Sequence, residues 1–235
     1  MTMKTYQMLL PWYKKKWGII LIALLVVLLA TILSFSLAVF NKVREMNSQS
    51  ALNSLQAYYA LLYNDYSPEL GADNALIEIV EFSDFQCPYC AQGSPVVVDL
   101  AKQYAGIINL TYRHFPIADI HPEAWGAAIA STCAAEQDKF WQYHDQLFAQ
   151  QDNFSQTTFF TIAKNLGLNT QDFDTCYTSE KYGYQVRKDL ADGLSLDLRG
   201  TPTYFINGEV ISGLLTRSQW QELIEAYLIG LQSNQ

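Results

Sequence analysis

The stretch Glu81–Cys90, EFSDFQCPYC, carries two cysteines separated by two residues. It overlaps the apolar run Leu76–Phe82, LIEIVEF, whose length, flanks and β-branched residues predict a short central strand. Pro88 suits the first turn of a helix, because the backbone N–H that proline lacks has no partner there. The stretch therefore predicts a strand, a turn and a helix, with both cysteines at the start of the helix.

A CxxC pair in this position favours thiol–disulfide chemistry. Unpaired N–H groups and the helix dipole stabilise negative charge at a helix N-terminus, so we expect the pKa of Cys87 to fall below its free value of about 8.5. A thiolate is both the nucleophile and the better leaving group in disulfide exchange. We therefore expect Cys87 to form the mixed disulfide and Cys90, one turn later and more buried, to resolve it.

Two other interpretations of the pair are weaker. Half of a zinc or iron–sulfur site would need a second pair, whereas Cys133 and Cys176 stand alone, each 43 residues after the preceding cysteine. A purely structural CxxC disulfide is the other alternative. The histidines at positions 114, 121 and 144 lack the close spacing of helical metal ligands, so we expect surface or structural roles for them. We expect no metal and no cofactor.

The rest of the chain predicts the order β-α-β, a block of helices, then β-β-α. In Gly200–Gly208, GTPTYFING, the pair Asn207-Gly208 predicts a type I′ hairpin. Sequence alone favours an ordinary trans Pro202 at the entry to a strand. The other predicted elements are helices at 95–104, 157–166, 170–179, 184–196 and 218–228, a helical stretch at 123–150, and strands at 107–113, 204–206 and 210–212.

The strings EFSDFQCPYC and GTPTYFING resemble the two signatures of the DsbA-like, thioredoxin-fold disulfide oxidoreductases, in the same order and over roughly residues 68–231. The resemblance implies an α/β thioredoxin fold with a helical domain inserted at about 117–196. It also implies that Pro202 is cis, that Thr201 precedes it beside the cysteines, and that the backbone of this loop binds an extended substrate peptide.

The resemblance further implies a buried acid at the position of Glu81 that moves protons at the buried cysteine. Burial in so apolar a strand would raise the pKa of Glu81, whereas an ordinary surface glutamate is the alternative, and Glu78 is the rival acid on the opposite face. Many strong oxidants of the family carry histidine where this chain has Tyr89, so a less extreme oxidant is expected. Asp84 and Gln86 are expected to cap loops or lie at the surface.

The N-terminal part predicts a membrane anchor. Residues 18–40 are 23 consecutive uncharged residues, enough for a helix of about 34 Å that crosses a bilayer. Four lysines precede this segment, so the positive-inside bias places residues 1–17 in the cytoplasm and the rest outside. We expect a stalk over 41–70 and an extracytoplasmic domain over 71–235. A cleaved signal peptide is the alternative, although the apolar run exceeds the usual signal core of about 7–15 residues.

Composition excludes two broad classes. Half of the residues are hydrophobic and 16% are charged, which excludes an intrinsically disordered protein. The chain beyond residue 40 holds 23 acidic and 11 basic residues. Nucleic-acid binding is therefore disfavoured, because phosphate contacts need a basic face.

The sequence thus predicts a membrane-anchored, extracytoplasmic thiol–disulfide oxidoreductase. The leading hypothesis is a monomeric dithiol oxidase that passes the Cys87–Cys90 disulfide to exported proteins and is reoxidised by a quinone-linked membrane thiol oxidase. A reductase or isomerase that uses the same CxxC is the first alternative, although residues 41–75 are too few for the dimerisation domain that isomerases usually add. A non-catalytic chaperone or binding module on a thioredoxin scaffold is the second.

Cys133 and Cys176 both fall in the predicted helical block and are expected to form a structural disulfide. An oxidising compartment makes two unpaired thiols there less favoured than one bridge. Two separate buried cysteines that act as small hydrophobes are the alternative.

Overall fold

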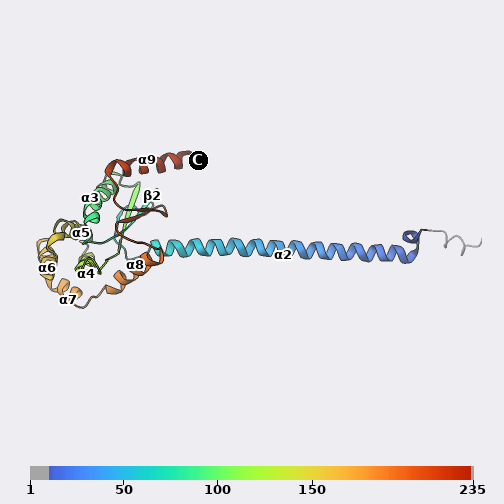
Figure 1. The fold of residues 1–235 in the computed structure, drawn as a ribbon, viewed down its shortest axis with the longest axis horizontal. Coiled ribbons are helices and arrows are strands. Elements are labelled where there is room, and N and C mark those ends of the chain that lie inside the picture. Colours follow the sequence, from blue (N-terminus) through green and yellow to red (C-terminus); the bar gives the residue numbers. More distant parts are fainter. Residues whose placement is uncertain (1–10, 234–235) are drawn as a thin grey trace, which may run out of the picture. The chain divides into compact units, whose positions relative to one another are not determined.

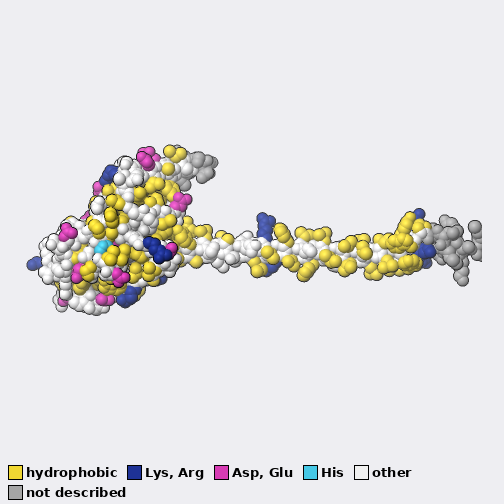
Figure 2. Space-filling model, in the orientation of Figure 1, with side chains coloured by type: hydrophobic (Ala, Val, Ile, Leu, Met, Phe, Trp, Pro, Cys, Tyr) yellow, Lys and Arg dark blue, Asp and Glu magenta, His cyan; other side chains and the backbone are white. Residues whose placement is uncertain are grey.

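The computed structural model describes residues 11–233 and consists of two compact units, residues 1–57 and 58–235. In the first unit, the short 3₁₀ helix η1 spans Trp12–Lys14, and most of helix α2, Lys16–Leu62, follows it. Within the described residues, α2 is the one helix that is long and apolar enough to cross a membrane, and it contains the predicted segment 18–40. Figure 2 shows hydrophobic side chains along this helix.

The second unit begins earlier in the chain than predicted. The last residues of α2, from Tyr58, belong to this unit, so the predicted stalk over 41–70 is too long. The reason is apolar burial: Leu62 is fully buried in a cluster with Phe82 and Phe205. The Tyr58 hydroxyl also donates a 2.6 Å hydrogen bond to the carbonyl oxygen of Gly208.

The domain is built on a five-stranded sheet in the order β1-β3-β2-β4-β5. The parallel pair β2 and β3 lies at its centre, and all other neighbours are antiparallel. As predicted, β2 is central and largely buried. The short edge strand β1 lies in the expected linker and is absent from the sequence prediction. The strands are β1, Glu69–Gly71, β2, Ile77–Ser83, β3, Ile108–His114, β4, Thr203–Ile206, and β5, Glu209–Ser212.

Helices cover both faces of the sheet. On one face, α3, Pro88–Gln103, and α9, Arg217–Ser233, pack on Ile77 and Ile79. On the other face, the end of α2 and the leucines around the C-terminal end of α8, Gly183–Ser195, pack on even-numbered residues of β2. Because strand residues alternate between faces, Glu81 and Ser83 point to the side of α3.

The helical insertion lies between β3 and β4, as the sequence predicts. Figure 1 shows α4, α5, α6 and α7 gathered on one side of the domain. Their shared core joins the core around the CxxC pair. The helices are α4, Ala124–Ala135, α5, Phe140–Ala149, the 3₁₀ helix η2, Gln151–Asn153, α6, Gln156–Asn165, and α7, Thr170–Thr178.

Two predicted helix boundaries are wrong. The helical stretch predicted at 123–150 is two helices, because Asp138 has a positive φ of 58° and ends the first. The segment predicted as a helix at 95–104 continues the helix that starts at Pro88, the residue predicted for a first helical turn, so Pro95 lies inside this helix on an exposed face. Proline suits the first turn of a helix, so either Pro88 or Pro95 could begin this helix. The burial of Cys90, Gly93 and Ser94 favours the helix that begins at Pro88.

Candidate functional site

The CxxC pair follows the C-terminal end of β2, where a short turn connects this central strand to α3. Cys87 is the N-cap residue of α3 and Pro88 the first helical residue. The turn is held by Asp84, whose Oδ1 accepts a 2.7 Å bond from the Gln86 N–H and whose Oδ2 accepts a 2.8 Å bond from the Ile117 N–H. Asp84 therefore caps the loop as predicted, but it is buried and does not lie at the surface.

The two thiols lie in different environments. Cys87 is 5% exposed and Cys90 is fully buried. The hydrogen bond from Cys90, together with donors of the first helical turn, lowers the pKa of Cys87 to about 5, against an opposing effect of burial. Burial first, and then the neighbouring Cys87, raises the pKa of Cys90 well above its usual value. The pair thus combines a stable thiolate on the slightly exposed Cys87 with a protonated thiol on the fully buried Cys90.

The distant proline loop meets this pair. The thiol of Cys87 donates a 3.4 Å hydrogen bond to the carbonyl oxygen of Thr201, and the Thr201–Pro202 peptide bond is cis. The buried Thr201 hydroxyl has no hydrogen-bond partner in the described part of the chain, and the Thr201 side chain helps to lower the pKa of Cys87. A hollow of about 470 Å³ opens beside the loop and extends to Val210 on β5.

Glu81 is fully buried on the face of β2 that α3 covers. Burial raises its pKa to about 7, and neither carboxyl oxygen has a hydrogen-bond partner among residues 11–233. The rival Glu78 is only partly buried and accepts a 3.1 Å bond from the Asn109 amide. The charge of Glu81 raises the pKa of Cys90. Of the two acids, Glu81 is therefore the one whose carboxyl is available for proton transfer near Cys90.

Two of the three histidines, His121 and His144, have hydrogen-bond partners, whereas neither ring nitrogen of His114 has one among residues 11–233. His144 is buried, and its ring nitrogens bond to Ser94 and Asp145 at 2.9 Å each. His121 bonds to Asp84 at 2.7 Å, and His114 is buried. Within the residues that the structure describes, no cluster of three or more His, Cys, Asp or Glu side chains has the form of a metal site.

Cys133 and Cys176 form a disulfide between α4 and α7, with Cα atoms 5.8 Å apart. Both residues are buried in the helical insertion. The structure therefore separates the four cysteines into one bonded pair and one pair of free thiols.

Two features of the site carry no strong sequence signal. Gln151, at the start of η2, donates to the carbonyl oxygens of Phe85 at 2.7 Å and Cys87 at 2.9 Å, and so clamps the turn before the helix. Tyr112 on β3 and Tyr204 on β4 are the register partners of Glu81. Alternation along each strand could indicate which face these tyrosines occupy, but only the strand register places them beside Glu81.

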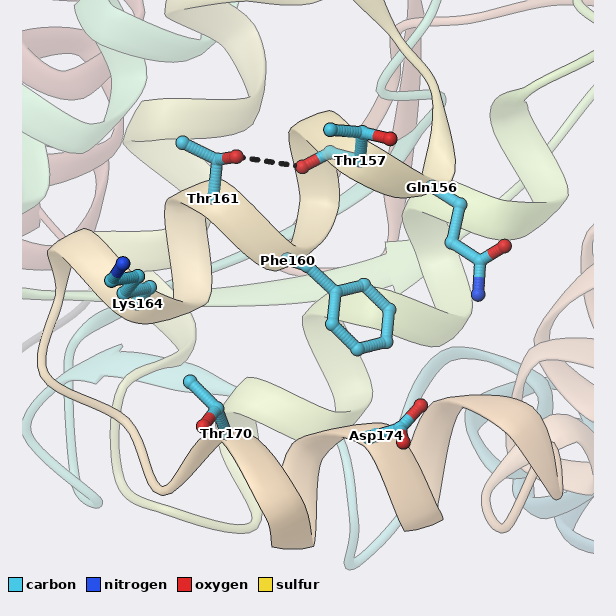
Figure 3. Close-up of a pocket in the computed structure, with 7 residues that line it drawn as sticks. All are labelled: Gln156, Thr157, Phe160, Thr161, Lys164, Thr170 and Asp174. Carbon is cyan, nitrogen blue, oxygen red and sulfur yellow. Dashed lines mark hydrogen bonds between the residues drawn. The ribbon is translucent and has the colours of Figure 1, made fainter.

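A larger hollow of about 600 Å³ lies elsewhere, between α6 and α7 (Figure 3). Its lining includes the exposed polar side chains of Thr161, Lys164 and Asp174, and the ring of Phe160. It contains no cysteine and lies on the insertion, so it does not belong to the thiol site.

Comparison with known proteins identifies the family and the structural relatives of the domain. The thioredoxin family model matches residues 63–226. A thioredoxin-like oxidoreductase from Silicibacter pomeroyi DSS-3 shares 26% identity and a TM-score of 0.61, over 71% of this chain and 95% of its own. The thiol-disulfide exchange protein alpha-DsbA2 from Wolbachia pipientis shares 18% identity and a TM-score of 0.66, over 77% and 97%. BdbD from Bacillus subtilis shares 24% identity and a TM-score of 0.60, over 69% and 93%.

Curated relatives are much longer. The chain is 36% identical over 138 residues to the Na⁺/H⁺ antiporter NhaA 3 of Salinispora tropica, a match that covers 59% of this chain and 21% of the antiporter. An NhaA 1 antiporter of Mycobacterium sp. strain KMS is 33% identical over 141 residues, which is 23% of its length. The chain thus spans about a fifth of these relatives. The family match covers most of the chain, and the solved structures share its domain architecture: the chain belongs to the thioredoxin family, with the DsbA-like form of the thioredoxin fold.

Proposed function

We propose that this chain is a thiol–disulfide oxidoreductase that works as a dithiol oxidase through Cys87 and Cys90. The observation that carries the proposal is the contrast between the two thiols, one with a pKa of about 5 and one with a strongly raised pKa. A stable Cys87 thiolate stabilises the reduced form, and a dithiol with a stabilised reduced form makes an oxidising disulfide.

The reaction transfers two electrons from substrate to enzyme. A substrate thiolate attacks the sulfur of Cys87, the Cys87–Cys90 bond breaks, and Cys90 leaves as a thiolate. Glu81, with a pKa of about 7, gives Cys90 its proton. A second substrate thiolate then attacks the substrate sulfur of the mixed disulfide, Cys87 leaves as its stable thiolate, and the substrate retains the new disulfide.

The proline loop supports the choice of protein substrates. The carbonyl of Thr201 lies against Cys87, and the 470 Å³ hollow beside the loop is open to an extended chain. We propose exported proteins with pairs of cysteines as substrates, bound by backbone hydrogen bonds along this loop. Thr201 and Pro202 are the proposed binding residues, and Cys87, Cys90 and Glu81 the proposed catalytic ones.

The location is part of the same proposal. The apolar section of α2 supports a single-pass anchor, and the charge bias of its flanks supports a cytoplasmic N-terminus with the domain outside. An oxidising compartment is where such a disulfide persists. We propose a quinone-linked membrane thiol oxidase as the reoxidant and a monomer as the working form. The antiport activity named for the longer relatives is not part of the proposal.

The test uses the oxidised full chain in detergent, mixed with a reduced, unfolded protein that contains several cysteines. We expect stoichiometric oxidation of substrate thiols by the wild type and none by Cys87→Ser. Cys90→Ser cannot form the redox disulfide and should oxidise no substrate thiols either. Given a disulfide-bonded substrate instead, its Cys87 thiolate should attack that disulfide, release one substrate thiolate and accumulate as a mixed disulfide, because Cys90 is missing to resolve it. A chain that oxidises no thiol but suppresses aggregation of the substrate contradicts the proposal and favours a chaperone.

The direction is tested by the reduction potential against a glutathione buffer. A value well above about −200 mV supports an oxidase, whereas a value near that of thioredoxin, about −270 mV, supports a reductase.

A further inference from the structure

Glu81 lies between two buried tyrosines. The strand register pairs Glu81 on β2 with Tyr112 on β3 and with Tyr204 on β4. Residues that pair in this way point to the same face of a sheet, so the three side chains form a row across the three central strands. All three are fully buried: Tyr204 lies in the core beneath α3 and α9, and Tyr112 lies in the core around the CxxC pair, beside the buried His114 and His144.

The polar atoms of this row share one property. Both carboxyl oxygens of Glu81, the hydroxyls of Tyr112 and Tyr204, and the neighbouring Ser83 hydroxyl have no hydrogen-bond partner within the described residues. Buried polar groups are normally paired, so a group of unpaired ones calls for an explanation, and a redox or catalytic role is one. The tyrosines are the strand-register neighbours of Glu81, and Ser83 lies two residues along the same strand on the same face.

Packing fixes both tyrosine rings. The ring of Tyr204 packs edge-on against Trp220 of α9, with centroids 4.8 Å apart, and the ring of Tyr112 stacks on Phe85 at 5.1 Å. A Cβ atom on Gly93 would lie 2.8 Å from the Tyr204 hydroxyl oxygen. That hydroxyl therefore lies against the backbone of α3, three residues after Cys90. The two rings hold their hydroxyls in place without help from hydrogen bonds.

We infer that Tyr112 and Tyr204 are positioning residues whose hydroxyl dipoles stabilise the Glu81 carboxylate while it exchanges a proton with Cys90. The inference rests on the proposed function of Glu81 and adds two residues to it. After burial, the charges of Glu81 and Cys90 raise the pKa of both tyrosines, as expected of groups that lie in one buried region. In a buried region, a fixed dipole counts for more than it does in water.

The ionisable groups that face Glu81 come from several elements. They are Tyr112 on β3, Tyr204 on β4, Cys87 and Cys90 at the start of α3, and Asp84 on the turn before α3. Two further ionisable residues, His114 and His144, contact the ring of Tyr112. In the oxidised chain the two redox thiols do not titrate. The tyrosines, with pKa values held above their usual value by burial first, stay neutral at physiological pH.

The test follows the protonation of Glu81 directly. The infrared band of its protonated carboxyl group is measured against pH in the oxidised full chain in detergent, and the band is assigned by its loss in Glu81→Gln. Removing a hydroxyl that stabilises the carboxylate should raise the midpoint. We expect Tyr204→Phe and Tyr112→Phe each to raise it by about half to one pH unit.

Tyr143→Phe is the matched control. It removes a buried hydroxyl that donates to the carbonyl oxygen of Phe159 inside the insertion, so it should leave the midpoint unchanged. A midpoint that stays constant or falls in either folded tyrosine variant overturns the inference. If Tyr204→Phe does not fold, Tyr112→Phe decides alone.

The infrared measurement is independent of thiol exchange. If the chain fails to oxidise substrate but its tyrosine variants shift the band, the result contradicts the proposed function and supports the effect of the two tyrosines on Glu81. If the chain oxidises substrate but the tyrosine variants leave the band unshifted, the result supports the proposed function and contradicts the role of the tyrosines.

Discussion

The thiol of Cys87 lies 3.4 Å from the carbonyl oxygen of Thr201, although 114 residues separate them in the chain. The contact joins the redox helix to the proline loop and places a backbone acceptor beside the reactive sulfur. Under the proposed function, a substrate cysteine therefore reacts beside the loop that is proposed to bind its backbone.

The first prediction concerns the two thiols. In the reduced chain, alkylation should label Cys87 first, with a pH midpoint near 5, because its pKa is lowered to about 5. Cys90 should react slowly even at high pH, because it is fully buried and its pKa is raised. Mass spectrometry of the labelled peptides measures both rates. Faster labelling of Cys90 would reverse the assigned roles.

The second prediction concerns the Thr201 side chain. Thr201→Val keeps its shape and removes the hydroxyl that helps to lower the pKa of Cys87. The pKa of Cys87 should rise by about one unit, since a hydrogen bond to a charged group contributes about 1.5 kcal/mol and one pKa unit corresponds to about 1.4 kcal/mol. The ultraviolet absorbance of the thiolate measures the shift. Thr216→Val, which alters a hydroxyl at the start of α9, is the control and should leave that absorbance curve unchanged.

The third prediction concerns stability and Glu81. Burial raises the pKa of Glu81 to about 7 from about 4.5, so the folded state holds a proton that the unfolded state loses. Its stabilising contribution is therefore complete below about pH 4.5 and is lost as pH rises to 7, by about 3 kcal/mol. Glu81→Gln should remove this part of the pH dependence. Denaturant unfolding of the oxidised chain at several pH values measures it, and parallel curves for wild type and variant would contradict it.

Local pattern and family resemblance predict most of this fold. The apolar run at 76–82 indicates a central strand, and Asn207 and Gly208 both have the positive φ values that a type I′ turn requires. The edge strand β1 is only three residues long and owes its pairing to β3, so no local pattern marks it. Likewise, Gln151 reaches the site through tertiary packing, and its own neighbours in sequence give no signal.

The domain boundary likewise depends on tertiary contacts that no local sequence pattern reveals. Residues 58–62 continue the helix of the first unit without a break in helical pattern. Their assignment to the domain follows from contacts with β4 and α8, which are distant in sequence. Composition alone therefore extends the stalk too far.

The fourth prediction concerns the buried Arg113. Its Nε donates to Asp189 and its Nη2 to Asp192, both at 2.7 Å, and its Nη1 donates to the carbonyl oxygens of Leu61 and Leu62. Arg113→Met leaves the buried Asp189 without its ion-pair partner, while Asp192 keeps Lys188, and the loss should cost about 3–5 kcal/mol of unfolding free energy. Arg217→Met removes an exposed pair with Asp99 and should cost less than about 1 kcal/mol. Similar losses in the two variants would contradict the role of burial.

The last prediction concerns the Cys133–Cys176 disulfide. It joins α4 to α7 across 43 residues of chain, so in the entropic model it restricts the unfolded state by about 4 kcal/mol. Replacing both cysteines with alanine should lower the melting temperature of the full chain by several degrees, as measured by circular dichroism. Exchange at Cys87 should remain nearly intact, because neither residue belongs to the turn that Asp84 and Gln151 hold. A double variant that keeps its stability but loses exchange would instead mean that this pair passes electrons to the CxxC centre.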